Sequence, residues 1–291
     1  MKLPLLQLHV AVFLWGFTGV LGRVITLNEG LLVWYRILIT IITLLGLLLY
    51  TKKLQFLPFK KTIQLFGIGA IIAIHWACFY GSIKYANVSI ALTCLSSAGL
   101  FTALLEPLFT KNKIKIKEVL LSLLGILGIY LIFHFDPSYQ LGICIGIVST
   151  LLSVVFSLFN KRVVTNYNSE TLMFYELVGG FLILSILMPL YLTILPTQQL
   201  IPTTNDWIWL VLLSWFCTIG AMYLSLTALK KVSVFTQNLT LNLEPVYGII
   251  LAFLVYKENR FLGSSFYIGF GLIFSSVVIQ MLRILKYKKI S

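Results

Sequence analysis

Charged side chains are scarce in this sequence. They make up 11% of the 291 residues, whereas hydrophobic residues make up 59%. A water-soluble domain carries about 25% charged residues, so an ordinary soluble domain is excluded. Acidic residues are the rarer charged group, with 9 Asp and Glu against 22 Lys and Arg, which leaves a formal net charge of +13.

The chain also has little from which a catalytic or metal centre could be built. His9 and His134 have no acidic partner at metal-ligand spacing. Neither a Gly-x-x-x-x-Gly-Lys phosphate loop nor a Gly-x-Ser-x-Gly nucleophile motif occurs. The cysteines lie in apolar stretches without the paired spacing of a zinc or redox motif, and we interpret them as packing residues: Cys78, Cys94, Cys144 and Cys217. We therefore expect no enzymatic activity, no metal and no cofactor.

Long apolar runs are what the sequence has in abundance. A helix needs roughly 20 mainly apolar residues to cross a bilayer, and ten such runs fill the chain. They begin near Leu6, Leu31, Thr62, Val88, Glu118, Gln140, Glu170, Trp207, Ser233 and Leu262. The first run has no A-x-A-like cleavage site, so we expect it to remain as a span. The sequence predicts an all-α, multi-pass membrane protein with ten transmembrane helices.

The second half of the chain resembles the first. Matching pieces occur in the same order, namely Arg23 to Thr26 with Arg162 to Thr165, Trp34 to Arg36 with Phe174 to Glu176, Tyr80 and Ser82 with Tyr223 and Ser225, and Gly125 with Gly269. A unit with an odd number of spans enters the membrane from opposite sides in its two copies, which is the inverted repeat of many secondary transporters. We predict one integral membrane domain over residues 1–291, with five-helix repeats at 1–136 and 137–291 around a central cavity.

The basic residues gather on one side of this topology. With the N-terminus inside, that side collects Lys2, Lys52, Lys53, Lys60, Lys61, Lys111, Lys113, Lys115, Lys117, Lys161, Arg162, Lys230, Lys231, Arg283, Lys286, Lys288 and Lys289. The other side collects only Arg23, Lys84, Lys257 and Arg260. Short loops rich in Lys and Arg stay in the cytoplasm. We therefore place both termini in the cytoplasm and the protein in the plasma membrane, and we expect lipid rather than nucleic acid as its surroundings.

Three segments carry a family resemblance. Leu14-Trp15-Gly16, the stretch from Ser233 to Tyr247 with its Glu244-Pro245, and Lys257-Glu258 resemble the EamA-type repeats of the drug/metabolite transporter superfamily. The resemblance implies a ten-helix bundle whose cavity is lined mainly by the first, third, fourth, sixth, eighth and ninth helices. It also implies export or exchange of small metabolites, often amino acids.

The first half departs from the family pattern. Glu106-Pro107 looks like a second Glu-Pro pair, but the repeat places Leu100-Phe101 opposite Glu244-Pro245. Small residues on the sixth span and Gly125-x-x-Gly128 with Gly269-x-Gly271 favour close helix packing. A contact in a homodimer is the alternative for these glycines.

Charges within spans are costly, so they tend to face a cavity or a partner. Arg36 and Glu176 are repeat counterparts that we place on opposite sides of the membrane and do not expect to pair. Arg36 either binds a carboxylate or extends its charge to the interface. Glu244 lies near the middle of the ninth span, in its most polar segment, and Pro245 predicts a kink there.

These patterns predict a substrate site at the membrane midplane. We expect Gln237, Asn238, Asn242 and Glu244 on the ninth span to face Trp15, His75 and Tyr80, with Thr93 and Ser97 as further donors. A polar network that only joins helices is the alternative, and Ser and Thr also bond their own backbone. If transport is coupled to protons, we expect Glu244 or His75 to carry the proton.

The predicted function is secondary transport of a small metabolite by alternating access, with a proton or a counter-substrate as the second species. Export or exchange of amino acids is favoured by the resemblance alone. An uptake carrier, a passive channel and a lipid scramblase remain as alternatives.

Overall fold

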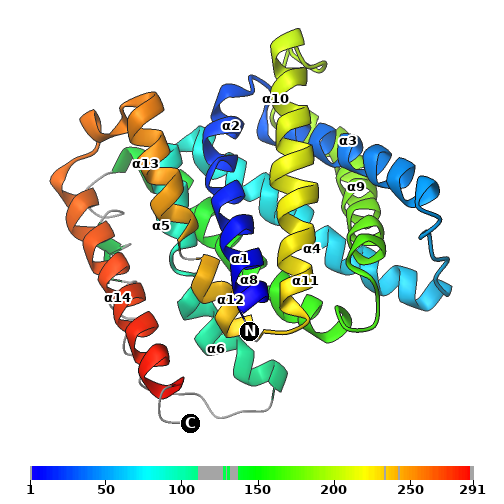
Figure 1. Cartoon of the computed structure of the whole chain (residues 1–291). Helices are drawn as coiled ribbons and strands as arrows, with labels where there is room; N and C mark the ends of the chain where they lie inside the picture. Colours follow the sequence, from blue (N-terminus) through cyan, green and yellow to red (C-terminus); the bar gives the residue numbers. More distant parts are fainter. Residues whose placement is uncertain are drawn as a thin grey trace.

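The computed structural model describes residues 2–110, 127–128, 130–131, 137–232, 234–241 and 243–288. Within these ranges every regular element is a helix (Figure 1). The helices of the first half are α1 (Lys2–Gly16), α2 (Thr18–Val24), α3 (Glu29–Tyr50), α4 (Phe59–Tyr85), α5 (Val88–Leu95) and α6 (Ala98–Thr110). Most of the predicted fifth span, which begins near Glu118, lies outside the described residues.

The second half begins with a short 3-10 turn, η1 (Pro137–Tyr139). Its helices are α8 (Gln140–Val163), α9 (Ser169–Ile194), α10 (Thr204–Ser214), the π-helical η2 (Trp215–Gly220), α11 (Ala221–Leu229), α12 (Val234–Leu241) and α13 (Glu244–Tyr256). The 3-10 turn η3 (Glu258–Arg260) and α14 (Ser264–Lys288) complete the described chain.

Seven segments in the described ranges are long and apolar enough to cross a membrane, namely Leu3–Val24, Glu29–Tyr50, Phe59–Tyr85, Val88–Phe109, Pro137–Val163, Ser169–Ile194 and Thr204–Leu229. They correspond to the predicted spans one to four and six to eight. Shorter apolar helices follow at Glu244–Tyr256 and Ser264–Ser275. The protein is therefore a multi-pass membrane protein, while the full ten-span inverted repeat stays a prediction.

Two spans are interrupted at comparable places. The fourth span stops at Leu95 and resumes at Ala98, and the ninth stops at Leu241 and resumes at Glu244. Pro245 occupies the first turn of α13, where its missing N–H costs nothing. Pro245 therefore lies at the start of a separate helix rather than inside a continuous one. Broken helices at corresponding positions of two halves are typical of transporter binding sites.

The eighth span continues without a break but changes its winding. Between α10 and α11 the six residues of η2 form a π-helix, a rare conformation that is found mostly at functional sites. Thr218 there donates its hydroxyl to the carbonyl oxygen of Leu213 at 3.0 Å. The wider turn presents the Cys217 carbonyl oxygen to Trp15, whose Nε1 donates to it at 2.9 Å.

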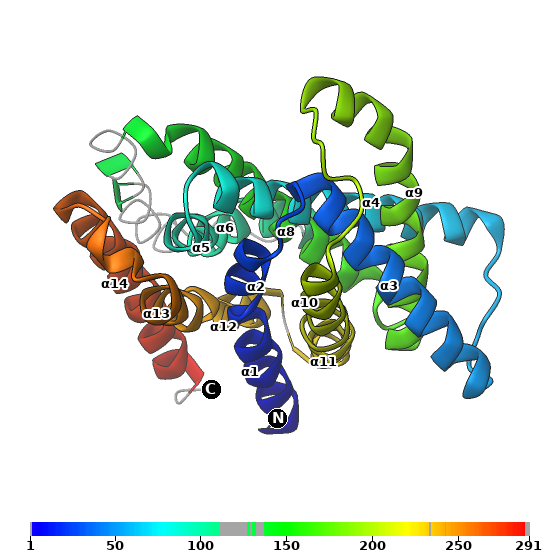
Figure 2. The same cartoon turned by 90° about the horizontal axis from the view of Figure 1, so that it is seen from above.

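Helix α4 lies at the centre of the bundle and packs along both α8 and α9. Glycine makes these contacts close, because a Cβ built on Gly69 would lie 1.6 Å from the carbonyl oxygen of Glu176 on α9. Seen from above (Figure 2), α1, α12 and α11 lie on one side of the bundle centre and α4, α6 and α8 on the other. The start of α1 and the last described turn of α14 lie at the same end of the bundle in Figure 1.

The glycines considered for packing or dimerisation have different surroundings. A Cβ on Gly128 would lie 2.4 Å from the carbonyl oxygen of Gly269, so Gly128 packs within the chain against α14. A Cβ on Gly271 would meet nothing within 4 Å, and Gly125 lies outside the described residues. Close packing is therefore seen for Gly128, whereas a homodimer stays a prediction.

Candidate functional site

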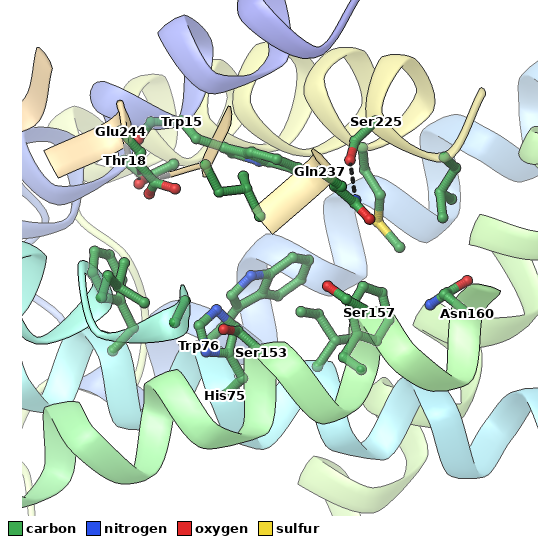
Figure 3. Close-up of a pocket in the computed structure, with 18 of the residues that line it drawn as sticks. Trp15, Thr18, His75, Trp76, Ser153, Ser157, Asn160, Ser225, Gln237 and Glu244 are labelled. Atoms are coloured by element: carbon green, nitrogen blue, oxygen red, sulfur yellow. Dashed lines mark hydrogen bonds between the residues drawn. The ribbon is translucent and has the colours of Figure 1, made fainter. Parts of the chain in front are cut away.

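A pocket lies between the two sides of the bundle. One wall is formed by α1, α2, α11, α12 and α13, and the other by α4, α5, α6 and α8 (Figure 3). Its polar and aromatic lining residues are Trp15, Thr18, Arg36, His75, Trp76, Phe79, Ser153, Phe156, Ser157, Asn160, Ser225, Gln237 and Glu244. The six spans that the resemblance implied all contribute lining residues, and α3 adds Arg36.

Arg36 is the cation of this pocket. Its side chain is 1% exposed, its Nε donates to the Thr218 hydroxyl at 2.7 Å, and its Nη1 donates to the Tyr80 hydroxyl at 2.9 Å. Its guanidinium carbon lies 3.9 Å from the centroid of the Trp76 ring, a favourable cation–π arrangement. Arg36 therefore does not extend to the interface, and its contacts leave some of the five guanidinium N–H groups available to a ligand.

Glu244 is the acidic residue of the same pocket. It is the first residue of α13, where the helix dipole favours a negative charge. The residue is partly exposed as a whole, and in the described part of the chain its carboxyl group has no hydrogen-bond or ion-pair partner. Arg36 acts on it through space rather than by direct contact. Glu244 is thus available to a cationic group of a ligand.

His75 forms the middle of the α4 wall. Its Nδ1 lies 2.8 Å from the carbonyl oxygen of Ser149 and 2.9 Å from the Ser149 hydroxyl. These contacts fix the ring against α8, and the side chain is 8% exposed. His75 therefore lines the pocket as the sequence predicted, with Trp76 beside it (Figure 3).

On the opposite wall, α12 contributes Gln237. Its Nε2 donates to the Ser225 hydroxyl at 2.8 Å, while its Oε1 is buried and has no partner. Trp15 lines the same wall and is held by η2. The positions of Trp15, His75, Gln237 and Glu244 around one pocket agree with the predicted grouping, and their role in binding stays a prediction.

Other predicted site residues do not line the pocket. Tyr80 is fully buried, and its hydroxyl accepts a hydrogen bond from Arg36, so it supports the site from behind. Thr93 donates to the Ser89 carbonyl oxygen at 2.7 Å, and Ser97 donates to the Cys94 carbonyl oxygen at 2.6 Å. Both hydroxyls bond their own backbone, which was the stated alternative.

Two further predicted site residues fall on the ninth span. Asn242 lies outside the described residues, and so does the side chain of Asn238. Thr240, on the same segment, donates to the carbonyl oxygen of Thr236 at 2.9 Å and is absent from the pocket lining.

The small residues of α8 divide between two roles. A Cβ on Gly142 would lie 2.5 Å from the Ala86 Cβ, and one on Gly146 would lie 2.8 Å from the Ser82 hydroxyl oxygen, so these glycines permit close packing. Farther along the same helix, Ser153, Ser157 and Asn160 line the pocket. The small and polar residues of α8 thus form a packing surface near its start and a pocket wall near its end.

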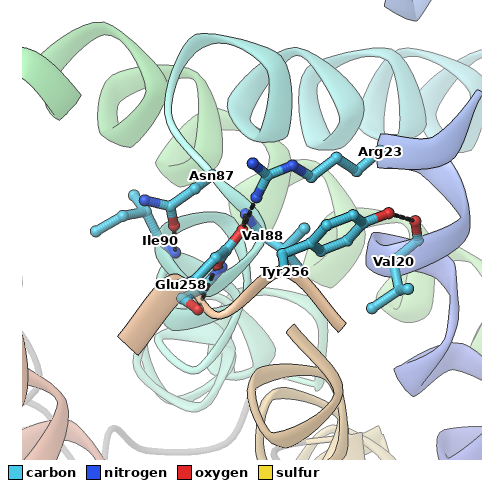
Figure 4. Close-up of polar contacts among 8 residues, drawn as sticks. Val20, Arg23, Asn87, Val88, Ile90, Tyr256 and Glu258 are labelled. Carbon is cyan, nitrogen blue, oxygen red and sulfur yellow. Dashed lines mark hydrogen bonds and ion pairs between the residues drawn. The ribbon is translucent and has the colours of Figure 1, made fainter. Parts of the chain in front are cut away.

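At the end of the bundle opposite the start of α1, an ion pair joins the two halves (Figure 4). Arg23 at the end of α2 pairs with Glu258 in η3, and its guanidinium carbon lies 4.3 Å from the centroid of the Tyr256 ring. Glu258 also accepts from the backbone N–H and the hydroxyl of Ser89 at 2.9 and 2.6 Å. The Glu258 carboxylate therefore also caps the first turn of α5.

Comparison with known proteins identifies the family. The sequence profile described as the EamA-like transporter family matches residues 2–134 and again residues 140–282. The chain belongs to the EamA-like transporter family. This confirms the resemblance seen in the sequence.

Two curated relatives of this EamA-like protein are named uncharacterized transporters. The one from Haemophilus influenzae is 24% identical over 162 residues, which cover 53% of this chain and 53% of the relative. The one from Archaeoglobus fulgidus is 25% identical over 177 residues, which cover 60% of this chain and 63% of the relative. The chain thus spans somewhat more than half the length of these relatives.

A solved crystal structure has the same fold. It aligns with a TM-score of 0.68 at 17% sequence identity and covers 96% of this chain and 97% of that chain. Nearly the whole length of this EamA-like protein therefore follows a known helical architecture.

Proposed function

We propose that this protein is a secondary transporter that exports or exchanges small metabolites by alternating access, with amino acids as its leading substrates. The observation that carries this proposal is the pair of opposite charges in one pocket. Arg36 and Glu244 both line it and make no ion pair with each other or with any other residue in the described ranges.

A basic and an acidic side chain that line one pocket without pairing are complementary to a zwitterion. A buried charge is costly unless it is paired, so a ligand that supplies both partners removes both costs. The Arg36 guanidinium fits a carboxylate, which it can bind through two N–H groups, and Glu244 fits an ammonium group. Trp15, Trp76 and Phe156 provide surfaces for an apolar side chain of the substrate.

The arrangement of the helices supports alternating access. The pocket lies between segments of the first and second halves, and broken helices at such a site are typical of secondary transporters. At one end of the bundle, Arg23 and Glu258 join α2 to η3. Separation of this ion pair would open that end, and its re-formation would close it.

The distribution of Lys and Arg supports a location in the plasma membrane with both termini in the cytoplasm. In that orientation Arg23 and Glu258 form an external closure. Lys161 and Arg162, at the last turn of α8, lie at the cytoplasmic side.

The experiment uses the purified protein in liposomes with a matched set of ligands: an amino acid, its amide, its deaminated acid and its decarboxylated amine. We expect the intact zwitterion to raise the melting temperature of the protein, because a ligand that binds only the folded state stabilises it. We also expect it to support saturable counterflow. Equal binding of all four compounds would contradict recognition through both charges.

The same transport measurement separates the alternative functions. Acceleration by substrate on the opposite side indicates a carrier, whereas linear flux without saturation would indicate a passive channel. Movement of labelled lipid between leaflets without a response to amino acids would indicate a scramblase. Net movement into oriented vesicles would distinguish uptake from export.

A further inference from the structure

A second buried acid lies outside the charge pair of the pocket. Glu176, in the second turn of α9, is 0% exposed, and neither of its carboxyl oxygens has a hydrogen-bond partner. The contact at Gly69 brings the α4 backbone against the α9 backbone at this residue. Glu176 is therefore enclosed between helices, and in the described part of the chain it forms no ion pair.

Asn160 connects this buried acid to the pocket. Its side chain is the polar group beside Glu176, and it lines the pocket from α8 (Figure 3). It is also 0% exposed, and both its Oδ1 and its Nδ2 have no hydrogen-bond partner. Two adjacent side chains thus carry four buried polar atoms without partners, which native proteins rarely tolerate outside functional sites.

The charged and titratable groups on the neighbouring helices have other partners. On α3, Arg36 bonds Thr218 and Tyr80, and on α4, His75 contacts Ser149. None of these groups forms an ion pair or a hydrogen bond with Glu176.

The titratable groups on α8 and α11 likewise form no hydrogen bond or ion pair with Glu176. On α8, Lys161 donates to the carbonyl oxygens of Leu229 and Val232 at 2.7 and 2.5 Å. On α11, Tyr223 is 37% exposed. Among the described residues, no cation therefore pairs with the Glu176 carboxylate.

A proton is therefore the simplest ligand for the Glu176 carboxylate. A carboxylate buried without a cation is strongly disfavoured, and protonation removes its charge. The resulting O–H can donate to Asn160 Oδ1, whereas the deprotonated form can accept from Asn160 Nδ2. A small rotation of the Asn160 amide can serve both forms, and the same amide faces the substrate.

We propose that Glu176 is a proton-binding site and that Asn160 couples its occupancy to the occupancy of the pocket. One proton from water binds the carboxylate to form the neutral acid, and the same proton leaves to water when the carboxylate re-forms. This proposal rests on the transport function proposed above. It assigns the coupling to Glu176 instead of Glu244 or His75, which the sequence favoured.

The test compares E176Q with wild type in liposomes, and E170Q serves as the matched control. Glu170 lies on the same helix but pairs with Lys53 at 3.4 Å near the surface. An imposed pH gradient, with the membrane potential clamped, should drive amino-acid accumulation by wild type and E170Q. In E176Q this accumulation should fall about tenfold or more, which is within the range of coupling between two sites, while counterflow continues.

A second measurement does not depend on vesicles. Addition of the amino acid to folded wild-type protein in weak buffer should release or take up protons, as read by a pH dye, and E176Q should show no such change. Accumulation by E176Q driven by the gradient would overturn the proposal, as would its loss in E244Q alone. Wild-type counterflow that ignores the pH gradient would reject the proton site and leave the transport function intact. Absence of wild-type counterflow and binding would reject the function itself.

Discussion

Arg36 and Glu176 are counterparts in the predicted repeat and are equally buried, at 1% and 0% exposure, yet their surroundings differ. Arg36 contacts Thr218, Tyr80 and Trp76, whereas Glu176 has no hydrogen-bond partner. A guanidinium stays charged in proteins and needs permanent partners. A carboxyl group can lose its charge by binding a proton. In the proposed mechanism, Arg36 therefore holds a fixed charge for the substrate, and Glu176 is an acid that changes its protonation state.

The largest effect on stability is expected from a substitution at Gly69, where α4 packs against α9 beside Glu176. Gly69→Val places a side chain into the α9 backbone, since even a Cβ would lie 1.6 Å from the Glu176 carbonyl oxygen. Overpacking costs about 1–3 kcal/mol, and more where backbone must move. We expect a large fall in melting temperature and in the folded fraction after size-exclusion chromatography.

Gly67→Ala is the control for this variant, because a Cβ at Gly67 on the same helix would meet nothing within 4 Å. It should keep or slightly raise the stability of α4. Equal stability of the two variants would show that the α4 and α9 backbones do not approach as closely as described.

A smaller effect is expected from Arg36→Lys, measured as amino-acid affinity by isothermal titration. Lysine keeps the charge but loses the planar guanidinium that bonds Thr218 and Tyr80 and lies over Trp76. Hydrogen bonds to charged groups contribute about 1.5–3 kcal/mol, so affinity should fall about 10-fold to 100-fold. E176Q should leave the affinity nearly unchanged. A stronger loss in E176Q than in Arg36→Lys would reverse the roles assigned to the two halves.

The smallest effects on stability are expected from removing one threonine hydroxyl near Arg36 and one on α9, the helix of Glu176. Thr218 bonds Arg36 and is fully buried, and Thr171 on α9 is also fully buried but has no partner. Thr218→Val should lower the free energy of unfolding by about 1–3 kcal/mol, because a buried charged donor loses its acceptor. Thr171→Val should change it by less than about 0.5 kcal/mol or raise it. Chemical denaturation in detergent would measure both, and a large loss in Thr171→Val would reveal a contact of that hydroxyl.

The sequence predicted the helical membrane fold because the long apolar runs that form membrane-spanning helices can be recognised from the sequence alone. The sequence also placed Glu244 and Gln237 at a central cavity, because polar residues in the middle of a membrane span tend to face a cavity or a partner. Arg36 and Glu176 form no ion pair with each other, and their location on opposite sides of the membrane stays a prediction.

Other features of the site could not be read from one sequence. Tyr80 supports Arg36 from behind, and Ser97 bonds its own backbone, because the direction of a side chain depends on the packing of neighbouring helices. The π-helix at Trp215–Gly220 has no sequence signature of its own. Asn160 was missed because it lies three residues before the end of α8, where a polar residue is ordinary.

The break in the ninth span has a consequence for biogenesis. Helix α13 has 13 residues and covers about 20 Å at 1.5 Å per residue, which is short of the roughly 30 Å hydrocarbon layer. It is therefore too short to cross the bilayer on its own. Gly16 at the end of α1 receives α13, since a Cβ there would lie 2.8 Å from the Tyr247 Cβ. The ribosome delivers α1 before α13, so the later segment enters a membrane that already contains its docking surface.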